Sequence, residues 1–246
     1  MSEEVISIKG LTKKFGSFTA VDHITFDVHK GEIFGFLGAN GAGKTSAMSM
    51  LCGLSRPTEG TGTVDGIDIC RNPEEVKRHI GYMCQHFSLY EDLTVSENVN
   101  LFCTIYGMSR HEIRERSKEV FGLLEMESML NERVKSLPTG WKQKLAFTVA
   151  TLHRPAVVFL DEPTGGVDPL TRRKFWELIY RASSEGMTVF VTTHYLDEAE
   201  YCNRVSIMVD GCIKALDTPA ALKARYGVET MDAVFRAVAA GAKRGD

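Results

Sequence analysis

The chain has 246 residues, of which 43% are hydrophobic and 25% charged, and its formal net charge is −3. This composition is typical of a globular protein with one sizeable core and room for an inserted subdomain, and it excludes the strongly basic class of nucleic-acid binders. No apolar run approaches the roughly 20 residues of a membrane-spanning helix, the acidic start predicts no signal peptide, and the scattered cysteines predict free thiols.

The first third of the chain predicts strands more than helices. Its apolar or alternating runs are short and are bounded by glycine, which is typical of β-strands. The predicted strands are 5–8, 24–28, 33–37, 62–69 (at a sheet edge) and 80–84, and one helix is predicted over about 43–52.

From Thr94 the pattern becomes helical. The sequence T-V-S-E that starts at Thr94 is a capping box, and Ser109 precedes a second helical stretch. A third helix begins within LPTGWKQKLAF, residues 137–147, where a turn with proline and glycine comes before a run of helix formers. Because this all-helical stretch interrupts an alternation of strands and helices, we predict an inserted helical subdomain over 87–154.

The last third of the chain alternates strands with helices. The predicted strands are 157–160, 188–193, 205–209 and 212–216, with helices over 172–184 and 196–201. The last two strands flank Asp210-Gly211, which is the strongest short hairpin signal in the chain. Strands that are almost wholly apolar and alternate with helices predict a mostly parallel, buried sheet. Residues 239–246 are predicted to form a frayed end.

The sequence GANGAGKT, residues 38–45, fits the phosphate-loop pattern G-x-x-x-x-G-K-[ST] and lies between a predicted strand and a predicted helix. Glycines let the backbone fold closely around phosphates, and the N–H groups at a helix N-terminus point toward the anion. Lys44 is expected to reach the β- and γ-phosphates, and Thr45 to give its hydroxyl to Mg²⁺. The motif predicts a bound nucleotide.

The sequence VVFLDEP, residues 157–163, places two carboxylates at the end of an apolar strand, which is the edge where open α/β folds bind ligands. Asp161 is expected to hold the metal, and Glu162 to accept a proton from an attacking water or to orient it. Alone, such a pair is more often a solvated strand end. A phosphate loop in the same chain favours the active-site interpretation.

The order of further residues narrows the choice of family. Gln85 follows the strand 80–84, LPTGWKQKLAF precedes the carboxylate strand, GGVDP follows it, and His194 ends the strand TVFVTT. This series resembles the ATP-binding subunit of ABC transporters over essentially the whole chain. The resemblance implies a P-loop NTPase core with a mostly parallel sheet, an N-terminal antiparallel β subdomain and an inserted α-helical subdomain. The implied division is 1–86 and 155–226 for the core with the β subdomain, 87–154 for the helical subdomain and 227–246 for a C-terminal tail.

The resemblance also assigns roles to single residues. Gln85 is expected to sense Mg²⁺ and the attacking water, His194 to contact the γ-phosphate, Phe15 to stack on adenine and Asp168 to lie at a dimer interface. Taken singly, each of the first three is more simply a loop, strand-end or core residue. The residues expected to bind ATP are Phe15, Gly38, Asn40, Gly41, Ala42, Gly43, Lys44, Thr45, Ser46, Thr139, Gly140 and Asp168; those expected to catalyse are Glu162, His194 and Gln85; those expected to bind Mg²⁺ are Thr45, Gln85 and Asp161.

In this family the helix that begins near Gly140 closes over the nucleotide of a second, head-to-tail subunit. The usual signature is Leu-Ser-Gly-Gly-Gln; here Leu137 and Gly140 match, whereas Pro138, Thr139 and Trp141 differ. Pro138 can donate no hydrogen bond. Either the site is weakened, or Thr139 supplies the missing hydroxyl; proline also simply suits the turn before a helix. We favour an active ATPase, and the pattern leaves open whether its two sites are equivalent.

We therefore expect the ATP-hydrolysing subunit of an ABC transporter at the cytoplasmic face of the cell membrane, with ATP and Mg²⁺ as cofactors. The expected partners are integral membrane subunits and a second ATP-binding subunit, with no nucleic acid. The segment ETMDAVFRAV and the altered signature look similar to the ABC-2 or multidrug export branch.

The segment FSLYEDL, residues 87–93, is expected to dock the membrane subunit through Phe87, Leu89 and Tyr90, unless these residues form a buried loop cluster. The alternatives are a soluble ABC-type ATPase and a regulatory module that barely hydrolyses ATP.

Overall fold

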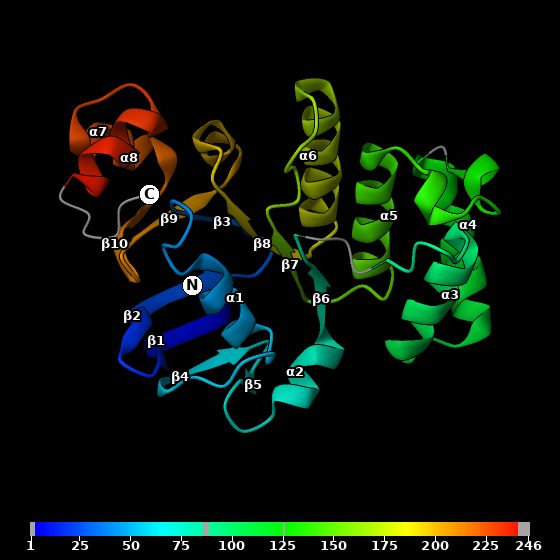
Figure 1. Cartoon of the computed structure of the whole chain (residues 1–246), viewed down its shortest axis with the longest axis horizontal. Coiled ribbons are helices and arrows are strands. Elements are labelled where there is room, and N and C mark those ends of the chain that lie inside the picture. The colour runs from blue at the N-terminus through cyan, green and yellow to red at the C-terminus, as the bar shows by residue number, and fades with distance from the viewer. Residues whose placement is uncertain (1–2, 86–88, 125, 241–246) are drawn as a thin grey trace.

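The computed structural model describes residues 3–85, 89–124 and 126–240, and it contains two β-sheets with helices packed around them (Figure 1). The smaller sheet is antiparallel with strand order β2-β1-β4-β5, and the larger sheet has the order β10-β9-β3-β8-β7-β6. Among the described residues, the larger sheet is parallel except at its edge pair, β9 and β10. The predicted α/β fold with a mostly parallel sheet is confirmed.

The strands that carry the candidate site are buried along their whole length. Every residue of β3, β7 and β8 is buried, because a parallel sheet is covered on both faces. The strands are β1 (Glu4–Phe15), β2 (Phe18–His29), β3 (Ile33–Leu37), β4 (Glu59–Val64), β5 (Ile67–Asp68), β6 (Ile80–Met83), β7 (Val157–Asp161), β8 (Thr188–Thr193), β9 (Arg204–Val209) and β10 (Cys212–Asp217).

The helices divide between those that cover the sheets and those that form the insertion. The first group is α1 (Lys44–Leu51), α2 (Pro73–His79), α6 (Pro169–Ser184), the 3-10 helix η3 (Leu196–Tyr201), α7 (Pro219–Tyr226) and α8 (Met231–Ala239). The second is α3 (Val95–Ile105), α4 (Arg110–Leu124), η1 (Glu127–Met129), η2 (Val134–Ser136) and α5 (Thr139–Thr151). In the described part of the chain, no helix is both long enough and apolar enough to cross a bilayer.

A group of aromatic rings holds the two sheets together. Phe26 of β2 stacks on Phe34 of β3 with ring centroids 5.6 Å apart. Phe36 and Phe190 pack against this pair, and Phe159 packs against Phe190. Offset stacked and tilted ring pairs add stabilisation beyond their buried area. The cluster fixes β3, whose carboxyl end leads into the phosphate loop.

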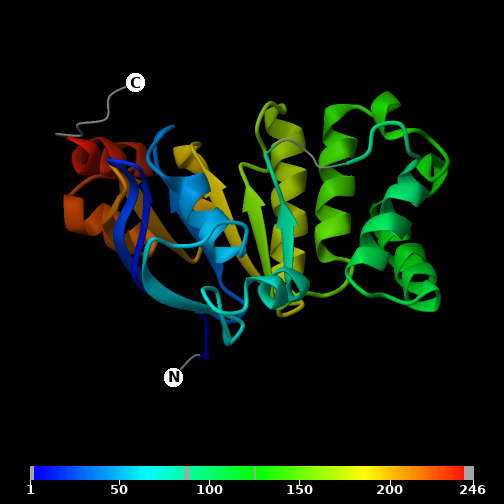
Figure 2. The same ribbon diagram turned by 60° about the horizontal axis from the view of Figure 1, so that its bottom comes forward.

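The helical insertion has its own apolar core and lies beside α6 (Figure 2). In both ribbon views α5 stands between α6 and the pair α3 and α4. The capping box predicted at Thr94 is confirmed, since Glu97 N–H donates to the Thr94 hydroxyl and Thr94 N–H donates to the Glu97 carboxylate. Buried apolar residues of α3 and α4 form one cluster with Leu145 and Val149 of α5, whereas Ala146, Phe147 and Ala150 of α5 belong to the cluster of the parallel sheet. Helix α5 therefore joins the core of the insertion to that of the sheet.

Three sequence predictions of secondary structure need correction. The single strand predicted over 62–69 is a hairpin, β4 and β5, because Asp65 and Gly66 both have positive φ and turn the chain. Helix α6 begins at Pro169 rather than at 172, because the Asp168 carboxylate caps it and proline suits the first helical position. Residues 196–201 are a 3-10 helix.

The C-terminal segment predicted as a tail contains a helix that packs on the body of the protein. In α8, Met231 and Val234 are buried in the same apolar cluster as β9 and α6. The predicted frayed end, 239–246, begins where α8 ends, and most of it lies outside the described residues. All six cysteines are free, as predicted.

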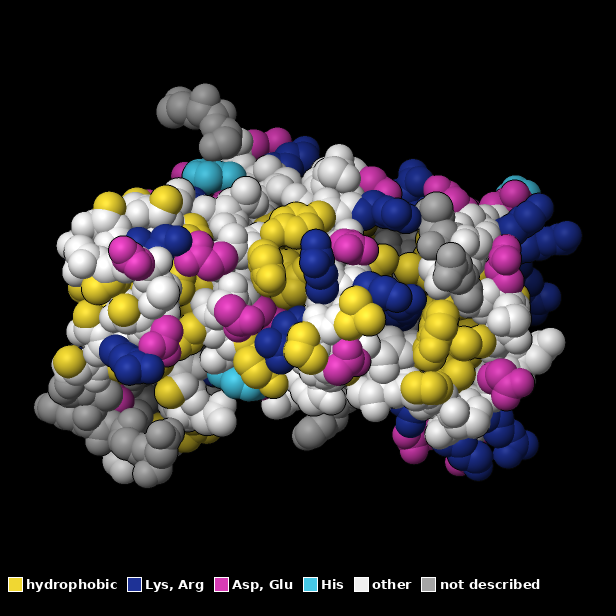
Figure 3. All heavy atoms as spheres, turned by 90° about the horizontal axis from the view of Figure 1, so that it is seen from above, with side chains coloured by type: hydrophobic (Ala, Val, Ile, Leu, Met, Phe, Trp, Pro, Cys, Tyr) yellow, Lys and Arg dark blue, Asp and Glu magenta, His cyan; other side chains and the backbone are white. Residues whose placement is uncertain are grey.

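Figure 3 shows one face of the molecule, seen from above the view of Figure 1. On this face the lysine and arginine side chains are interspersed with acidic and hydrophobic ones. A nucleic-acid-binding surface requires cations gathered in one patch or stripe. This face has no broad basic patch among its described residues.

Candidate nucleotide site

The phosphate loop joins the carboxyl end of β3 to the start of α1 and is tightly enclosed by its neighbours. A Cβ atom on Gly43, which has a φ of 106°, would lie 2.4 Å from the carbonyl oxygen of Ala20. A Cβ atom on Gly38 would lie 2.7 Å from the carbonyl oxygen of Met208. Glycine is required at these two positions because the backbones of β2 and β9 approach so closely. The phosphate loop thus lies between a strand and a helix, as its sequence motif predicted.

The loop opens onto a cleft of about 560 Å³. Its lining includes ten of the predicted residues: Phe15, Asn40, Gly41, Gly43, Lys44, Thr45, Ser46, Gln85, Glu162 and His194. Gly38 and Ala42 belong to the loop but do not line the cleft. The structure therefore gathers residues from five parts of the sequence around one space beside the phosphate loop.

Two aromatic rings stand at the mouth of this cleft. Phe15 and Phe18 are paired across the β1–β2 turn, both line the cleft, and they are 56% and 52% exposed. Large aromatic side chains exposed to this degree offer flat apolar surface to a ligand ring. Phe15 was predicted here and Phe18 was not. A signal existed, since the two phenylalanines flank a short Gly-Ser turn.

Lys44 is a buried cation aimed into the loop. Its side-chain amine donates hydrogen bonds of 2.7 Å and 3.1 Å to the carbonyl oxygens of Gly38 and Ala39, and lies 3.6 Å from a carboxylate oxygen of Glu162. Burial lowers the pKa of Lys44, and the negative charge of Glu162 partly offsets that shift. The arrangement gives the loop a positive charge that a phosphate could neutralise.

Glu162 lies at the centre of the predicted catalytic group. One of its carboxylate oxygens accepts a hydrogen bond of 3.1 Å from the Gln85 amide and lies 3.0 Å from Nδ1 of His194. Its backbone has a φ of 47°, which is rare for a long side chain and strained. The Glu162 N–H donates to the backbone and side-chain oxygens of Thr192, and these bonds hold the unusual conformation.

Asp161 lies beside Thr45, deeper in the site. Burial raises the pKa of Asp161, while hydrogen bonds from Thr192, at 2.6 Å, and from Thr45 act in the opposite direction. Asp161 does not itself line the cleft, but a carboxylate next to a hydroxyl supplies the oxygen donors that Mg²⁺ prefers, since this ion is usually bound by one or two carboxylates together with phosphates. The donor set therefore suits the predicted metal at this position.

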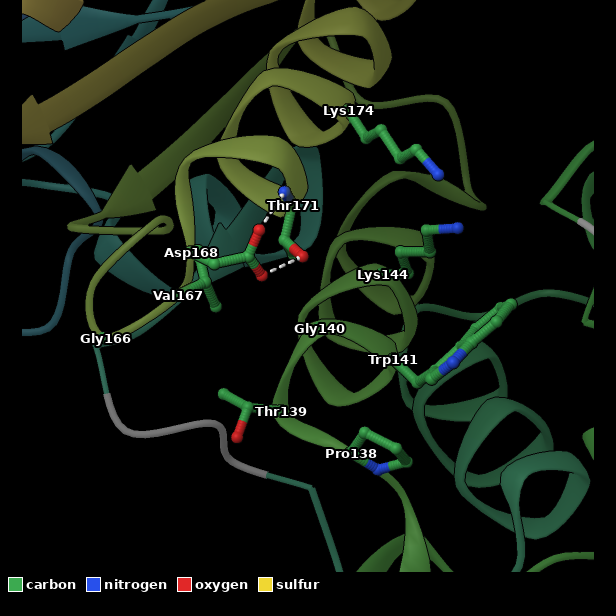
Figure 4. A pocket seen from close by; sticks show the side chains of 10 residues that line it. All are labelled: Pro138, Thr139, Gly140, Trp141, Lys144, Gly166, Val167, Asp168, Thr171 and Lys174. Carbon is green, nitrogen blue, oxygen red and sulfur yellow. Dashed lines mark hydrogen bonds between the residues drawn. The ribbon is translucent and has the colours of Figure 1, made fainter.

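Three predicted nucleotide-binding residues lie elsewhere. Thr139, Gly140 and Asp168 line a second pocket of about 390 Å³, formed by the starts of α5 and α6 (Figure 4). In Figure 4 Thr139 points to the same side of α5 as Asp168, whereas Trp141 points to the other side. Among the residues that the structure describes, the two pockets of one chain share no lining residue.

Close contacts between two helix starts build this second pocket. The Asp168 carboxylate caps α6 by accepting hydrogen bonds from Leu170 N–H and Thr171 N–H and from the Thr171 hydroxyl, and these bonds, the last above all, lower the pKa of Asp168. A Cβ atom on Gly140 would lie 2.9 Å from the Thr171 methyl carbon. Pro138, the N-cap residue of α5, provides no side-chain cap, and Trp141 N–H already donates to the Pro138 carbonyl. Among the described residues, the N–H groups of Thr139 and Gly140 therefore remain for another acceptor.

Comparison with known proteins agrees with this geometry. The sequence profile of the family described as "ABC transporter" matches residues 21–165. The chain is 48% identical over 226 residues to the probable multidrug ABC transporter ATP-binding protein YbhF of Escherichia coli (strain K12), an alignment that covers 91% of this chain and 39% of YbhF. The chain thus spans about two fifths of the length of that relative.

Two solved structures are similar to the chain as a whole. An ATP-binding subunit of an ABC transporter superposes with a TM-score of 0.87 and 28% identity, over 95% of this chain and 99% of the other. The dimeric ATP-binding cassette MJ0796, bound to ADP and Pi in a post-hydrolysis state, superposes with a TM-score of 0.78 and 28% identity, over 87% of this chain and 98% of the other.

Proposed function

Because the chain belongs to the ABC transporter family and is an ABC-type ATPase, we propose that it hydrolyses MgATP in a head-to-tail dimer and drives export through separate membrane subunits. The observation that carries this proposal is the position of Glu162, held among Lys44, Gln85 and His194 in the cleft beside the phosphate loop. The export direction rests on the similarity to YbhF, whose name describes a multidrug transporter protein. The proposed location is the cytoplasmic face of the cell membrane.

The residues of the cleft divide the work of hydrolysis between them. The phosphates of ATP would replace the loop carbonyls as partners of the Lys44 amine, because a charged acceptor binds an ammonium group more strongly. Thr45 and Asp161 would hold Mg²⁺, which neutralises phosphate charge when bound. Glu162 would then be free to take a proton from the attacking water, with Gln85 and His194 keeping its carboxylate in place.

We propose that the second pocket is completed by the ATP of a second subunit. Thr139 and Gly140 lie at an uncapped helix start, where the N–H groups and the helix dipole favour an anion. The dimeric form of MJ0796 supports this arrangement by similarity. In this interpretation Thr139 supplies the hydroxyl that Pro138 lacks, and its side chain is exposed and points into the pocket.

Thr139→Ala is expected to lower turnover by about ten- to a hundredfold while leaving ATP affinity unchanged, because a hydrogen bond to a charged group contributes about 1.5–3 kcal/mol and this one forms only in the closed dimer. Pro138→Ser is expected to match or exceed the wild-type rate. Steady-state ATPase assays, with Ser136→Ala as a control outside the pocket, measure both. If neither variant differs from wild type, the start of α5 has a structural role alone.

An exposed aromatic and aliphatic patch, formed by Tyr90, Phe102 and Ile105, is the proposed docking site for the membrane subunit. Tyr90 and Ile105 are 55% and 65% exposed, and the Tyr90 ring lies 6.0 Å from that of Phe102. The buried Asn98 side chain hydrogen-bonds both backbone groups of Tyr90 and so fixes the loop. Leu89, also predicted to dock, is instead partly buried against two core clusters. Phe87 lies outside the described residues.

A cysteine at position 91 is expected to cross-link to a cytoplasmic loop of the membrane subunit in the intact complex. Glu91 directly follows Tyr90 and is exposed, so a short cross-linker placed there would reach a docked loop. Lys214→Cys, on the exposed surface of β10, is the matched control and is expected to give no such product. Mass spectrometry identifies the joined peptides. Equal capture from both positions would contradict docking at this patch.

A further inference from the structure

A buried carboxylate lies behind the catalytic group and contacts two segments that lead to it. Glu198 is fully buried in η3, and its two oxygens accept hydrogen bonds of 2.5 Å from the hydroxyls of Thr164 and Thr193. Thr193 directly precedes His194, and Thr164 follows Glu162 by two residues. A buried charge is unfavourable unless it is paired and hydrogen-bonded, so Glu198 strongly restrains both segments.

The cation that faces Glu198 is Arg172 of α6. Its Nε lies 3.7 Å from a Glu198 oxygen, which is within ion-pair range but beyond hydrogen-bond reach. This buried Nε has no hydrogen-bond partner among the described residues. The guanidinium also lies 3.9 Å from the centre of the Tyr195 ring and 3.6 Å from a carboxylate oxygen of Asp197. One arginine therefore contacts three residues of the segment that follows His194.

Arg172 is also next in sequence to a residue of the second pocket. Thr171 lines that pocket, contacts Gly140 and donates to the Asp168 carboxylate. A displacement of the start of α6 moves Thr171 and Arg172 together, because both belong to the first turn of one helix. Since the Arg172 Nε is less than an ångström outside hydrogen-bond reach of Glu198, a small shift would make or lose that bond.

We propose that Arg172 and Glu198 are positioning residues that transmit occupancy of the second pocket to His194 and the segment 162–164. Neither residue lines the cleft that holds the phosphate loop, so both act through the groups they hold. The inference rests on the proposed function, in which the two pockets of one chain serve two different ATP molecules. Arg172 and Glu198 then couple the two ATP sites of the dimer.

The test measures ATP affinity, kcat, KM and the Hill coefficient for ATP in the complex that the full chain forms with its copurifying partners. Arg172→Ala is expected to lower kcat by about fivefold or more, the lower end of typical coupling between sites, and to bring the Hill coefficient toward one, with ATP affinity unchanged. Its melting temperature is expected to fall, because the buried Glu198 carboxylate loses its cation, so the kinetics are measured below the unfolding transition. Arg172→Lys keeps the charge and is expected to restore part of the loss. Arg173→Ala removes an exposed arginine from the same helix turn and is expected to behave as wild type.

Glu198→Gln provides a second, independent test. Glutamine can keep hydrogen bonds with both threonine hydroxyls but loses the attraction to Arg172, so it is expected to reproduce the Arg172→Ala kinetics. The double variant is expected to be no worse than either single one, because the two residues act as one unit. Additive losses, an unchanged Hill coefficient or an equal loss in Arg173→Ala would overturn the inference. Any of these three contrary outcomes, found together with full loss of turnover in Glu162→Gln, would leave the proposed function in place. Only the proposed coupling between the two ATP sites would then fail.

Discussion

Glu162→Gln is expected to bind ATP as the wild type does and to hydrolyse it roughly a hundredfold to ten-thousandfold more slowly, which is the usual contribution of a general base. Glutamine has the same size and can still accept a hydrogen bond from Gln85, so the cleft keeps its shape. It cannot take a proton from water. The variant should therefore accumulate as an ATP-bound dimer, since the closed state forms but does not turn over.

Single-turnover hydrolysis and size-exclusion chromatography with ATP measure these two effects. Glu177→Gln, an exposed glutamate on α6, is the matched control and should hydrolyse at the wild-type rate. A wild-type rate in Glu162→Gln would remove the assignment of the base. If the wild-type chain itself turned over as slowly as the variant, the regulatory-module interpretation would replace that of a transport ATPase.

Lys44→Ala is expected to weaken ATP binding by about ten- to a hundredfold, because it removes a charge-assisted hydrogen bond of about 1.5–3 kcal/mol to the phosphates. The loop should keep its shape, since its conformation is fixed by the close approach of Gly43 to Ala20 and of Gly38 to Met208. Lys44→Ala should therefore change the ATP affinity, whereas Thr139→Ala should change only the turnover rate.

Isothermal titration calorimetry with ATP gives the affinity, and circular dichroism confirms the fold. Lys214→Ala removes one exposed lysine outside the cleft and keeps the net charge equal to that of the Lys44 variant, so any difference between the two is local. Unchanged affinity in Lys44→Ala would contradict the phosphate-loop interpretation.

Local sequence pattern is enough to predict which residues the structure brings together beside the phosphate loop. The apolar strands β3, β7 and β8 run parallel, so the phosphate loop, the two carboxylates and His194 meet at one edge of the sheet. The apolar runs predict the strands, and the polar residues directly after each run predict which side chains reach that edge. The second pocket is different, because the residues that match the signature lie apart from the cleft in a single chain.

Contacts between distant segments could not be predicted in this way. Glu198 lies in a polar stretch of the sequence, which predicts an exposed side chain. In the structure it is fully buried, and Thr164, Thr193 and Arg172, from three other segments, lie against its carboxylate. Other differences had signals in the sequence. The Asp65-Gly66 pair is of the same type as Asp210-Gly211 and divides β4 from β5. The Thr-Pro pair at 218–219 marks the start of α7, where Thr218 caps the helix.

The β9–β10 hairpin supports the phosphate loop, although it lies far from the phosphate-loop motif in the sequence. Gly211 N–H donates to the Ala42 carbonyl in the phosphate loop, and Gly211 accepts from Asp22 N–H in the antiparallel sheet. The family profile ends at residue 165, so the matched segment contains the whole motif but none of this support. A fragment cut after β8 would leave both backbone groups without these partners. The phosphate loop and strand β2 therefore depend for these two hydrogen bonds on a segment far along the chain, and we expect such a long-range contact to form later in folding than the local ones.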